Sequence, residues 1–182
     1  MVAVDLPRPP APAAVAIVRD FVNTTDHETG SDDIATPAAL VRYLREEGLG
    51  STARGSAADL ELAHQLRAGL RRALELNHDG ESGSIPQLQA ALRRLPVGLD
   101  WSGEAATLRV TGQGVPGALA RIGLAAHECS ADGTWWRLKI CSYDECEWAY
   151  YDRSKNRSRN WCEYGCGNKV KTRAYRARQR SG

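Results

Sequence analysis

The residues best suited to chemistry in this chain are cysteines that lie in two pairs near its C-terminal end. They are Cys141, Cys146, Cys162 and Cys166. Four residues separate the first pair, three separate the second, and fifteen lie between the pairs. At this spacing, two tight turns can present four thiolates to one tetrahedral Zn²⁺ with Zn–S bonds of about 2.3 Å. The pattern therefore predicts Zn²⁺ as the cofactor.

The predicted zinc site is structural rather than catalytic. A catalytic zinc ion is usually held by three protein ligands and keeps one coordination position for water. Here four cysteines are available as ligands, and no histidine lies between Cys129 and the C-terminal end. We interpret Cys129 itself as an ordinary, partly buried cysteine, with a spare or redox-exchanging ligand as the alternative.

Disulfides are the alternative to zinc, and they depend on the cellular compartment. The early apolar run at residues 13–18 is too short for a secretory segment and is followed by Arg19 and Asp20. No stretch approaches the roughly 20 apolar residues of a membrane span. We therefore expect a cytoplasmic, nucleoid-associated protein with no membrane partner, whose cysteines stay reduced and bind metal.

Charge is distributed unevenly along the chain. Residues 1–138 hold 13 Lys and Arg against 17 Asp and Glu, a net charge of −4. Residues 139–182 hold 11 Lys and Arg against 5 Asp and Glu, a net charge of +6. Four thiolates and Zn²⁺ would lower the second value to about +4. A small segment this polar cannot build a hydrophobic core, so its folding is predicted to depend on metal.

The basic residues lie on both sides of the second cysteine pair. The stretch 153–160, which we call the basic loop, holds Arg153, Lys155, Arg157 and Arg159. After Cys166, Gly167 is predicted to take a positive φ and Asn168 to cap the start of a final helix.

Cations on this final helix recur at i, i+4, i+7 and i+11, and so form one continuous face. They are Lys169, Arg173, Arg176 and Arg180, flanked by Lys171 and Arg178. With the basic loop and Asn168, this face is predicted to bind double-stranded DNA, because each neutralised phosphate releases counterions. A solvated basic tail is the alternative.

The elements upstream are predicted mainly from apolar periodicity and from start and stop residues. Helices are expected over 14–23, 36–48, 56–80, 84–95 and 116–128, a hairpin over 97–101 and 105–111 with its turn at Ser102–Gly103, and a strand over 135–140. The predicted fold class is α+β: a mainly helical domain with a small β-hairpin, then a small treble-clef or knuckle-like zinc finger with four cysteine ligands that ends in a basic helix. The expected divisions are a flexible N-terminus at 1–13, the helical domain at 14–130, a junction at 131–138 and the finger at 139–182.

No catalytic constellation accompanies these elements. His27 lies among acidic residues, which is compatible with a metal or acid–base site, but a solvated loop between helices explains it more simply. The sequence shows no phosphate-binding glycine loop, no dinucleotide-binding glycine pattern and no nucleophile–base pair. We therefore expect a protein that is not an enzyme.

The C-terminal residues resemble the CGNR zinc finger. The resemblance rests on Cys141-x4-Cys146-x-Trp148, on Tyr151-Asp152-x-Ser154-x-Asn156-x-Ser158, and on Trp161-Cys162-x3-Cys166-Gly167-Asn168. Residues 20–24 resemble the opening of the ABATE domain, which usually precedes this finger. The resemblance implies a bacterial, often actinobacterial, stress-induced transcription regulator that binds zinc and DNA. Lys169 stands where the motif has arginine, which keeps the charge but loses the bidentate fork.

The same resemblance implies that the N-terminal domain senses a ligand or mediates assembly. A small-molecule effector and a homodimer are therefore candidate partners, and a conformational equilibrium at the junction would change how the finger is presented. Asp20, Asn23 and Thr24 are the candidate pocket residues, with capping of the first helix as the alternative. Two other functions stay open: an RNA- or protein-binding adaptor that uses zinc only for folding, and an enzyme with a site in the helical domain.

Overall fold

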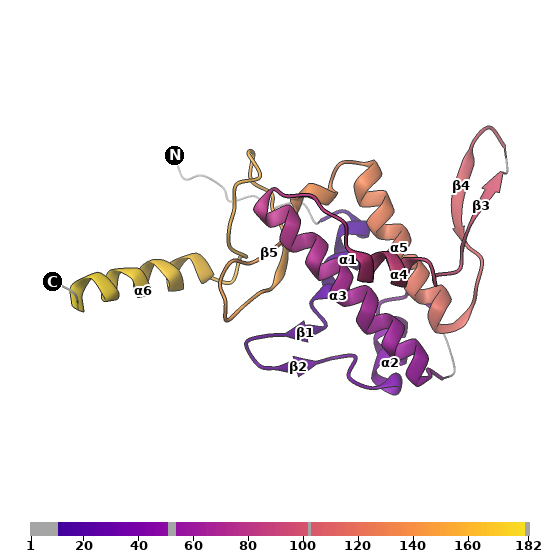
Figure 1. Ribbon diagram of the computed structural model, residues 1–182, viewed down its shortest axis with the longest axis horizontal. Coiled ribbons are helices and arrows are strands. Elements are labelled where there is room, and N and C mark those ends of the chain that lie inside the picture. Colours follow the sequence, from indigo (N-terminus) through magenta and orange to yellow (C-terminus); the bar gives the residue numbers. More distant parts are fainter. Residues whose placement is uncertain (1–10, 51–53, 102, 181–182) are drawn as a thin grey trace, which may run out of the picture.

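The computed structural model describes residues 11–50, 54–101 and 103–180 (Figure 1). The flexible N-terminus predicted for residues 1–13 lies outside the described residues, apart from its last three positions. Ser102, at the predicted hairpin turn, and residues 181–182 also lie outside them.

In the described part of the helical domain, α1, α3 and α5 form the centre, and α2 and α4 lie at their edges. The bounds are α1 Ala13–Val22, α2 Pro37–Glu46, α3 Ala57–Asp79, α4 Pro86–Leu92 and α5 Gly114–Ala131. Each central helix turns an apolar stripe inward, as the fully buried side chains of Phe21, Leu66 and Leu119 show. Burial of these stripes is the main source of the domain's stability.

Several helix boundaries follow directly from local residue chemistry. The Thr36 hydroxyl accepts a backbone N–H at 3.1 Å, and Pro37 occupies the first helical position of α2. Ser56 and Asp59 form a reciprocal capping box at the start of α3, and Gly80 ends that helix in the left-handed conformation with φ +71°. The predicted ends of these two helices are confirmed to within two residues.

The described strands form three two-stranded antiparallel sheets. The pairs are β1 Thr25–Asp26 with β2 Ser31–Asp32, β3 Val97–Trp101 with β4 Ala106–Val110, and β5 Leu138–Ile140 with β6 Ala149–Tyr151. The predicted hairpin at 97–111 is confirmed, and it projects from one end of the helical body (Figure 1). The final helix, α6 Cys166–Arg180, projects from the opposite end.

Two predictions upstream of the cysteines need correction. The helix expected over 84–95 covers only Pro86–Leu92. The strand expected from residue 135 begins instead with a 3₁₀ turn, η1 Trp135–Arg137, and becomes β5 only at Leu138. The 3₁₀ turn has a long-range cause. The Asn77 side chain on α3 donates hydrogen bonds to the carbonyls of Trp135 and Leu138 and so turns the chain between them.

The β5–β6 hairpin belongs to two cores at once. Leu138, Ile140 and Ala149 pack into the core of the helical domain. Tyr150 and the four clustered cysteines form a second, smaller core. Successive strand residues point to opposite faces, so three-residue strands suffice to join the two cores. The finger is therefore docked against the helices rather than carried on a free linker.

The predicted α+β fold class, with a small four-cysteine finger that ends in a helix, is confirmed. Within the described residues, no helix combines the length and the apolar character that crossing a membrane requires.

Candidate metal centre and nucleic-acid interface

The four cysteines of the two pairs meet in one buried cluster, which we call the cysteine cluster. Their sulfur atoms all lie within 4.8 Å of one another. The Cys146 and Cys162 sulfurs are 3.7 Å apart, and the Cys162 and Cys166 sulfurs are 3.5 Å apart. A tetrahedron with Zn–S bonds of about 2.3 Å has edges of roughly 3.8 Å. The donor set and its spacing therefore fit a tetrahedral metal ion, and no disulfide forms between the cysteines.

Backbone N–H groups hold the sulfurs in place. The N–H of Cys162 lies 3.5 Å from the Cys141 sulfur, and the N–H groups of Trp148 and Tyr164 hydrogen-bond the sulfurs of the preceding cysteines. Such outer-shell donors orient the ligands and partly neutralise their charge.

Burial disfavours negative charge on the sulfur atoms of the cysteine cluster. It raises the pKa of the Cys146 thiol and of the Cys162 thiol to about 12 each, and that of Cys166 to about 11. Buried thiols of this kind stay protonated at neutral pH unless a cation stabilises their thiolates. Loss of the thiol protons is therefore favoured only together with the binding of a cation.

Two residues in the left-handed region shape the cysteine turns. Gly165 has φ +80° just before Cys166, and Glu147 has φ +45° just after Cys146. The prediction of a positive φ at Gly167 is wrong, because α6 already begins at Cys166. Instead, the absent Cβ of Gly167 leaves room for the Trp161 ring, which would lie 3.2 Å from such an atom.

Asn168 is likewise not the cap of the final helix. It lies within the first turn of α6, and its N–H donates to the Gly165 carbonyl at 2.9 Å. The helix starts earlier than predicted because Cys166 is both a cluster residue and the first residue of α6. Any ion held by the cluster is thereby attached directly to the helix.

A buried ion pair, which sequence reasoning missed, organises the basic loop. The Lys139 ammonium lies 3.1 Å from the Asp152 carboxylate, and both side chains are almost fully buried. The same ammonium donates to the carbonyls of Arg157 and Arg159. The Asp152 carboxylate accepts the N–H groups of Ser154 and Arg159 at 2.9 Å and 3.0 Å.

This pair fixes the loop backbone from inside. Burial alone would raise the pKa of Asp152, but the hydrogen bonds from Ser154, Arg159 and Lys139 outweigh it and hold that pKa below its ordinary value. Asp152 belongs to the quoted motif, whereas Lys139 shows only as a lone charge between apolar neighbours. The position of Lys139 between Leu138 and Ile140 is the one feature of the sequence that could have identified it as a buried residue.

The cations of the basic loop do not all point the same way. Lys155 and Arg157 are exposed, and Arg157 has a left-handed backbone with φ +53°. The guanidinium of Arg153 lies over the Tyr151 ring at 5.8 Å, and Arg159 folds back to pair with Glu163 at 3.1 Å. The first two are therefore the freest of the four for an external ligand.

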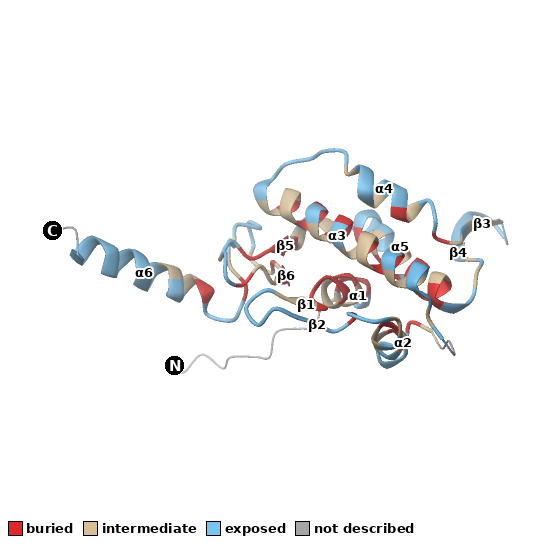
Figure 2. Cartoon of the chain, turned by 60° about the horizontal axis from the view of Figure 1, so that its bottom comes forward, coloured by how far each residue is buried: buried red, intermediate tan, exposed pale blue. Residues whose placement is uncertain are grey.

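The predicted cationic face of α6 divides into an inner and an outer part. The inner cations pair with the body of the protein: Lys169 lies 3.2 Å from Glu28, and Arg173 lies 3.4 Å from Glu145. The outer cations form no ion pair that we observe within the described residues; they are Lys171, Arg176, Arg178 and Arg180. All residues from 171 to 180 are exposed, as Figure 2 shows.

Polar side chains of the helical domain clamp the finger. The Asn23 amide both donates to and accepts from the backbone of Ala149 in β6, at 2.9 Å and 2.7 Å. Arg71 on α3 donates to the Glu147 carbonyl at 2.7 Å and to the Val22 carbonyl at 3.3 Å. The clamp thus holds both the hairpin and the turn that follows Cys146.

The three predicted pocket residues have different environments. Asp20 lines a cavity of about 310 Å³ between α1 and β6, where it pairs with Arg19 at 2.7 Å. Asn23 belongs to the clamp, and the buried Thr24 hydroxyl accepts a hydrogen bond from Arg67 at 2.9 Å. The structure does not gather the three around one cavity, and an effector site at these residues stays a prediction.

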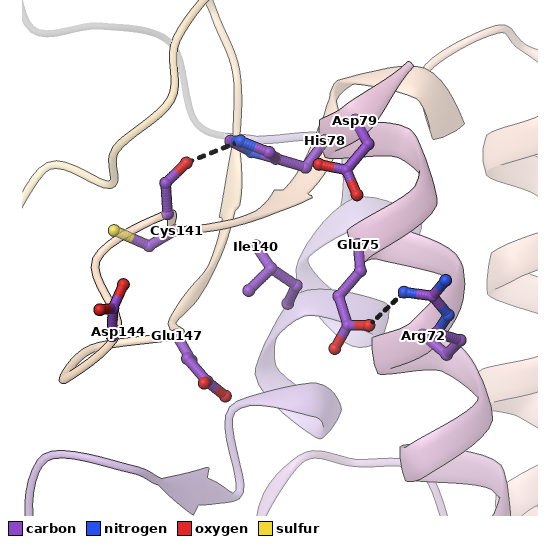
Figure 3. Close-up of a pocket in the computed structure, with 9 residues that line it drawn as sticks. Arg72, Glu75, His78, Asp79, Ile140, Cys141, Asp144 and Glu147 are labelled. Carbon is purple, nitrogen blue, oxygen red and sulfur yellow. Dashed lines mark hydrogen bonds and ion pairs between the residues drawn. The ribbon is translucent and has the colours of Figure 1, made fainter. Parts of the chain in front are cut away.

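A second cavity, of about 450 Å³, lies between α3 and the first cysteine turn (Figure 3). Its lining includes four carboxylates, those of Glu75, Asp79, Asp144 and Glu147. His78 accepts or donates a 2.7 Å hydrogen bond with Ser142, and burial lowers the pKa of His78. Both the helical domain and the metal-binding turn therefore contribute to this cavity.

The two remaining candidate residues, Cys129 and His27, have structural contacts rather than a site of their own. Cys129 is fully buried on α5 and lies outside the cysteine cluster. His27, in the β1–β2 connection, lies 3.3 Å from the Glu147 carboxylate and is partly exposed. The acidic loop around His27 thus contacts the finger rather than forming a separate site.

Comparison with known families agrees with this two-part arrangement. Residues 7–133 match the family model ABATE, described as "Putative stress-induced transcription regulator". Residues 137–179 match the CGNR zinc finger. A search of curated proteins found no match.

Proposed function

The chain belongs to the ABATE family and ends in a CGNR zinc finger, and from this premise we propose that it is a zinc-dependent, DNA-binding regulator of transcription. Zn²⁺ is the proposed ion because four thiolates in a closed tetrahedral set are typical of structural zinc sites. The proposed location is the cytoplasm, at the nucleoid.

One observation carries the proposal: α6 is a basic helix whose residues 171–180 are all exposed. Its fifteen residues include six Lys and Arg and no Asp or Glu. At 1.5 Å per residue it extends roughly 22 Å. Beyond its packed first turn, this polar helix gains little stability from contacts with the rest of the described protein. Its charge instead suits the phosphates of a DNA duplex.

The cysteine cluster and the buried pair act together in this proposal. Cys141, Cys146, Cys162 and Cys166 hold the ion, which supplies folding free energy and fixes the start of α6. The Lys139–Asp152 pair sets the backbone of the basic loop, so Lys155 and Arg157 face outward. Phosphate contacts from a loop and a helix would position the finger on the duplex.

Phosphates must displace two internal ion pairs when the inner part of α6 binds. Lys169–Glu28 and Arg173–Glu145 are both exposed, and exposed pairs contribute little stability. Replacement of a carboxylate by a phosphate at Lys169 and Arg173 should therefore cost little free energy. In this proposal the acidic residues also disfavour weak, non-specific partners.

The helical domain is proposed to control how the finger is presented. It contacts the finger through Asn23 and Arg71 and through a shared apolar core. A small-molecule effector that shifts this interface would alter DNA affinity only through differential binding to two arrangements. Titration of candidate metabolites against DNA affinity tests this part.

The experiment that tests the function is binding of the metal-loaded protein to pooled genomic duplex fragments at ~150 mM salt, with a chelated sample as the control. We expect enrichment of discrete fragments that chelation abolishes. Weak and uniform binding would reduce the finger to a backbone clamp. Absence of duplex binding would contradict the proposal and direct the search to RNA or a protein partner.

A further inference from the structure

Glu147, the residue that follows the cluster residue Cys146, has an unusual backbone conformation. Its φ is +45°, and among the described residues Arg157 is the one other non-glycine residue with a positive φ. In this left-handed region the Cβ atom lies too close to the following carbonyl oxygen, so the conformation persists only where neighbouring groups fix it. A group that holds Glu147 in place is therefore part of what gives the first cysteine turn its shape.

The left-handed residue closes the turn between Cys141 and Cys146. The N–H groups of Cys146 and Glu147 both donate to the Tyr143 carbonyl, at 2.8 Å and 3.1 Å. The Cys141 N–H donates to the Trp148 carbonyl at 2.9 Å, which returns the chain to the β5–β6 pairing. The Trp148 N–H hydrogen-bonds the Cys146 sulfur. The positions of both sulfur atoms in this pair therefore depend on the backbone of Glu147.

Arg71 on α3 is the side chain that holds this backbone. Its guanidinium donates to the Glu147 carbonyl at 2.7 Å and to the Val22 carbonyl, at the end of α1, at 3.3 Å. It also lies 3.8 Å from the Glu147 carboxylate, and only 13% of the Arg71 side chain is exposed. A planar guanidinium that is buried and donates to two carbonyls has little freedom to turn. Arg71 therefore links the cysteine turn to two helices.

One peptide group transmits the contact from Arg71 to the metal site. The carbonyl that accepts from Arg71 and the N–H that reaches the Cys146 sulfur both belong to the peptide group between Glu147 and Trp148. A trans peptide group is planar, so its carbonyl and its N–H point in opposite directions. Arg71 on one side thus fixes the direction of the donor on the other. Such outer-shell donors orient metal ligands, and they favour the charged form of a sulfur atom.

We propose that Arg71 is a positioning residue of the metal centre, which acts through the peptide group between Glu147 and Trp148 to keep Cys146 in its metal-binding arrangement. The proposal rests on the metal site of the proposed function and does not depend on DNA binding. The metal affinity of the finger then depends on a side chain of the helical domain, although all four residues of the cysteine cluster belong to the finger. Periodicity and spacing give Arg71 no such role, because 76 positions separate it from Glu147.

The Zn²⁺ affinity of the full-length chain, measured by competition with a chromophoric chelator, tests the proposal. Arg71→Met keeps the apolar part of the side chain and removes its donors, and the affinity should fall by about tenfold, as is typical of outer-shell variants. Arg72→Met is the matched control. Arg72 is an exposed neighbour on the same helix, where it pairs with Glu75 at 2.9 Å (Figure 3). Its removal should leave the Zn²⁺ affinity unchanged.

A glycine at position 147 distinguishes positioning from a general contribution to stability. Glycine adopts the left-handed region without the penalty of a Cβ atom, so the turn then needs less support. Arg71→Met combined with Glu147→Gly should therefore bind Zn²⁺ about fivefold more tightly than Arg71→Met alone. Arg71→Met combined with Glu147→Gln removes the same carboxylate but keeps the Cβ atom, and it should recover no affinity.

A second substitution at the same residue covers the case in which Arg71→Met does not fold. Arg71→Lys keeps the charge but loses the fork that reaches both carbonyls, so its loss of Zn²⁺ affinity should be smaller than that of Arg71→Met. Glu147→Gly should recover this loss in the same way. Circular dichroism verifies that the helices are folded in each variant.

Zn²⁺ affinity at the wild-type level in folded Arg71→Met, or in Arg71→Lys where Arg71→Met does not fold, would overturn the proposal and leave the metal site standing. A loss of affinity that Glu147→Gly does not recover, or that Glu147→Gln recovers equally, would overturn it as well, because Arg71 would then act by another route. A wild-type chain that binds no Zn²⁺ would instead contradict the metal site itself, and with it the proposed function.

Discussion

The two elements that project from the ends of this molecule, α6 and the β3–β4 hairpin, have opposite surface chemistry. α6 displays six basic residues and no acidic ones. One face of the hairpin, which we call the hairpin face, is apolar at all six of its positions: Val97, Leu99, Trp101, Ala106, Leu108 and Val110. Most of each surface is exposed among the described residues. The two ends of the described chain therefore differ in the surface that they present, which is cationic at one end and apolar at the other.

The two elements are also anchored by different forces. α6 starts at Cys166, so its attachment depends on the metal centre. The hairpin is anchored by close backbone packing at Gly112 and Gly117, which needs no ion. Between them, the helical core holds β5 and β6 directly. Loss of metal should therefore affect one end of the molecule and spare the other.

The largest expected effect follows from removal of a metal ligand. Cys162→Ser should abolish metal binding and unfold the cysteine turns together with α6, because structural zinc contributes an apparent ~10–16 kcal/mol in small fingers. The docked β5–β6 hairpin and the helices should stay folded. Metal analysis and hydrogen exchange measure both parts. Cys129→Ser, a buried cysteine outside the cluster, is the control. Full metal content in Cys162→Ser would mean that the ligand set is wrong.

The next largest effect concerns the buried ion pair. Lys139→Met leaves the Asp152 carboxylate buried without its cation, which should cost about 3–5 kcal/mol. The metal should still bind, but the basic loop should exchange its amide hydrogens faster and become sensitive to protease. Denaturant unfolding and limited proteolysis report these changes. Lys155→Met removes an exposed lysine from the same loop and should change neither. Unchanged stability in Lys139→Met would show that the metal alone shapes the loop.

A smaller effect is expected at the clamp between the finger and the helices. Asn23→Ala deprives the Ala149 N–H and carbonyl of their partners, which should cost about 1–3 kcal/mol. Thermal unfolding should then show earlier loss of the finger than of the helical domain. Asn156→Ala, at an exposed site in the basic loop, serves as the control. A single unfolding transition that keeps the wild-type midpoint would argue against this clamp.

The smallest change in stability should accompany a change in DNA binding. Arg173→Ala combined with Arg176→Ala should leave metal content and folding intact. The slope of log affinity against log salt should fall by about 2, close to one unit for each lost phosphate contact. Arg42→Ala combined with Arg45→Ala removes the same charge from the exposed side of α2. An equal loss of slope in that control would place the DNA contacts elsewhere.

What the sequence determined by itself was local. Cysteine spacing of three and four residues places two ligands in each turn, so the metal cluster could be expected before any packing was known. Caps such as Thr36 and Ser56 act within a few residues of themselves, and the hairpin at 97–111 follows from alternation alone. The outer cations of α6 could likewise be predicted, because their spacing along the helix is a local pattern.

Only the tertiary structure decided how distant residues are paired. Asn23 lies 126 positions from its partner Ala149, and the Asn77 amide reaches 58 positions to the carbonyl that turns the chain before β5. The buried pair of Lys139 and Asp152 likewise depends on two strands that meet in space. Periodicity predicts that an apolar face exists, but only packing decides whether that face is buried. That is why the hairpin face emerged as a surface only once the helices were placed.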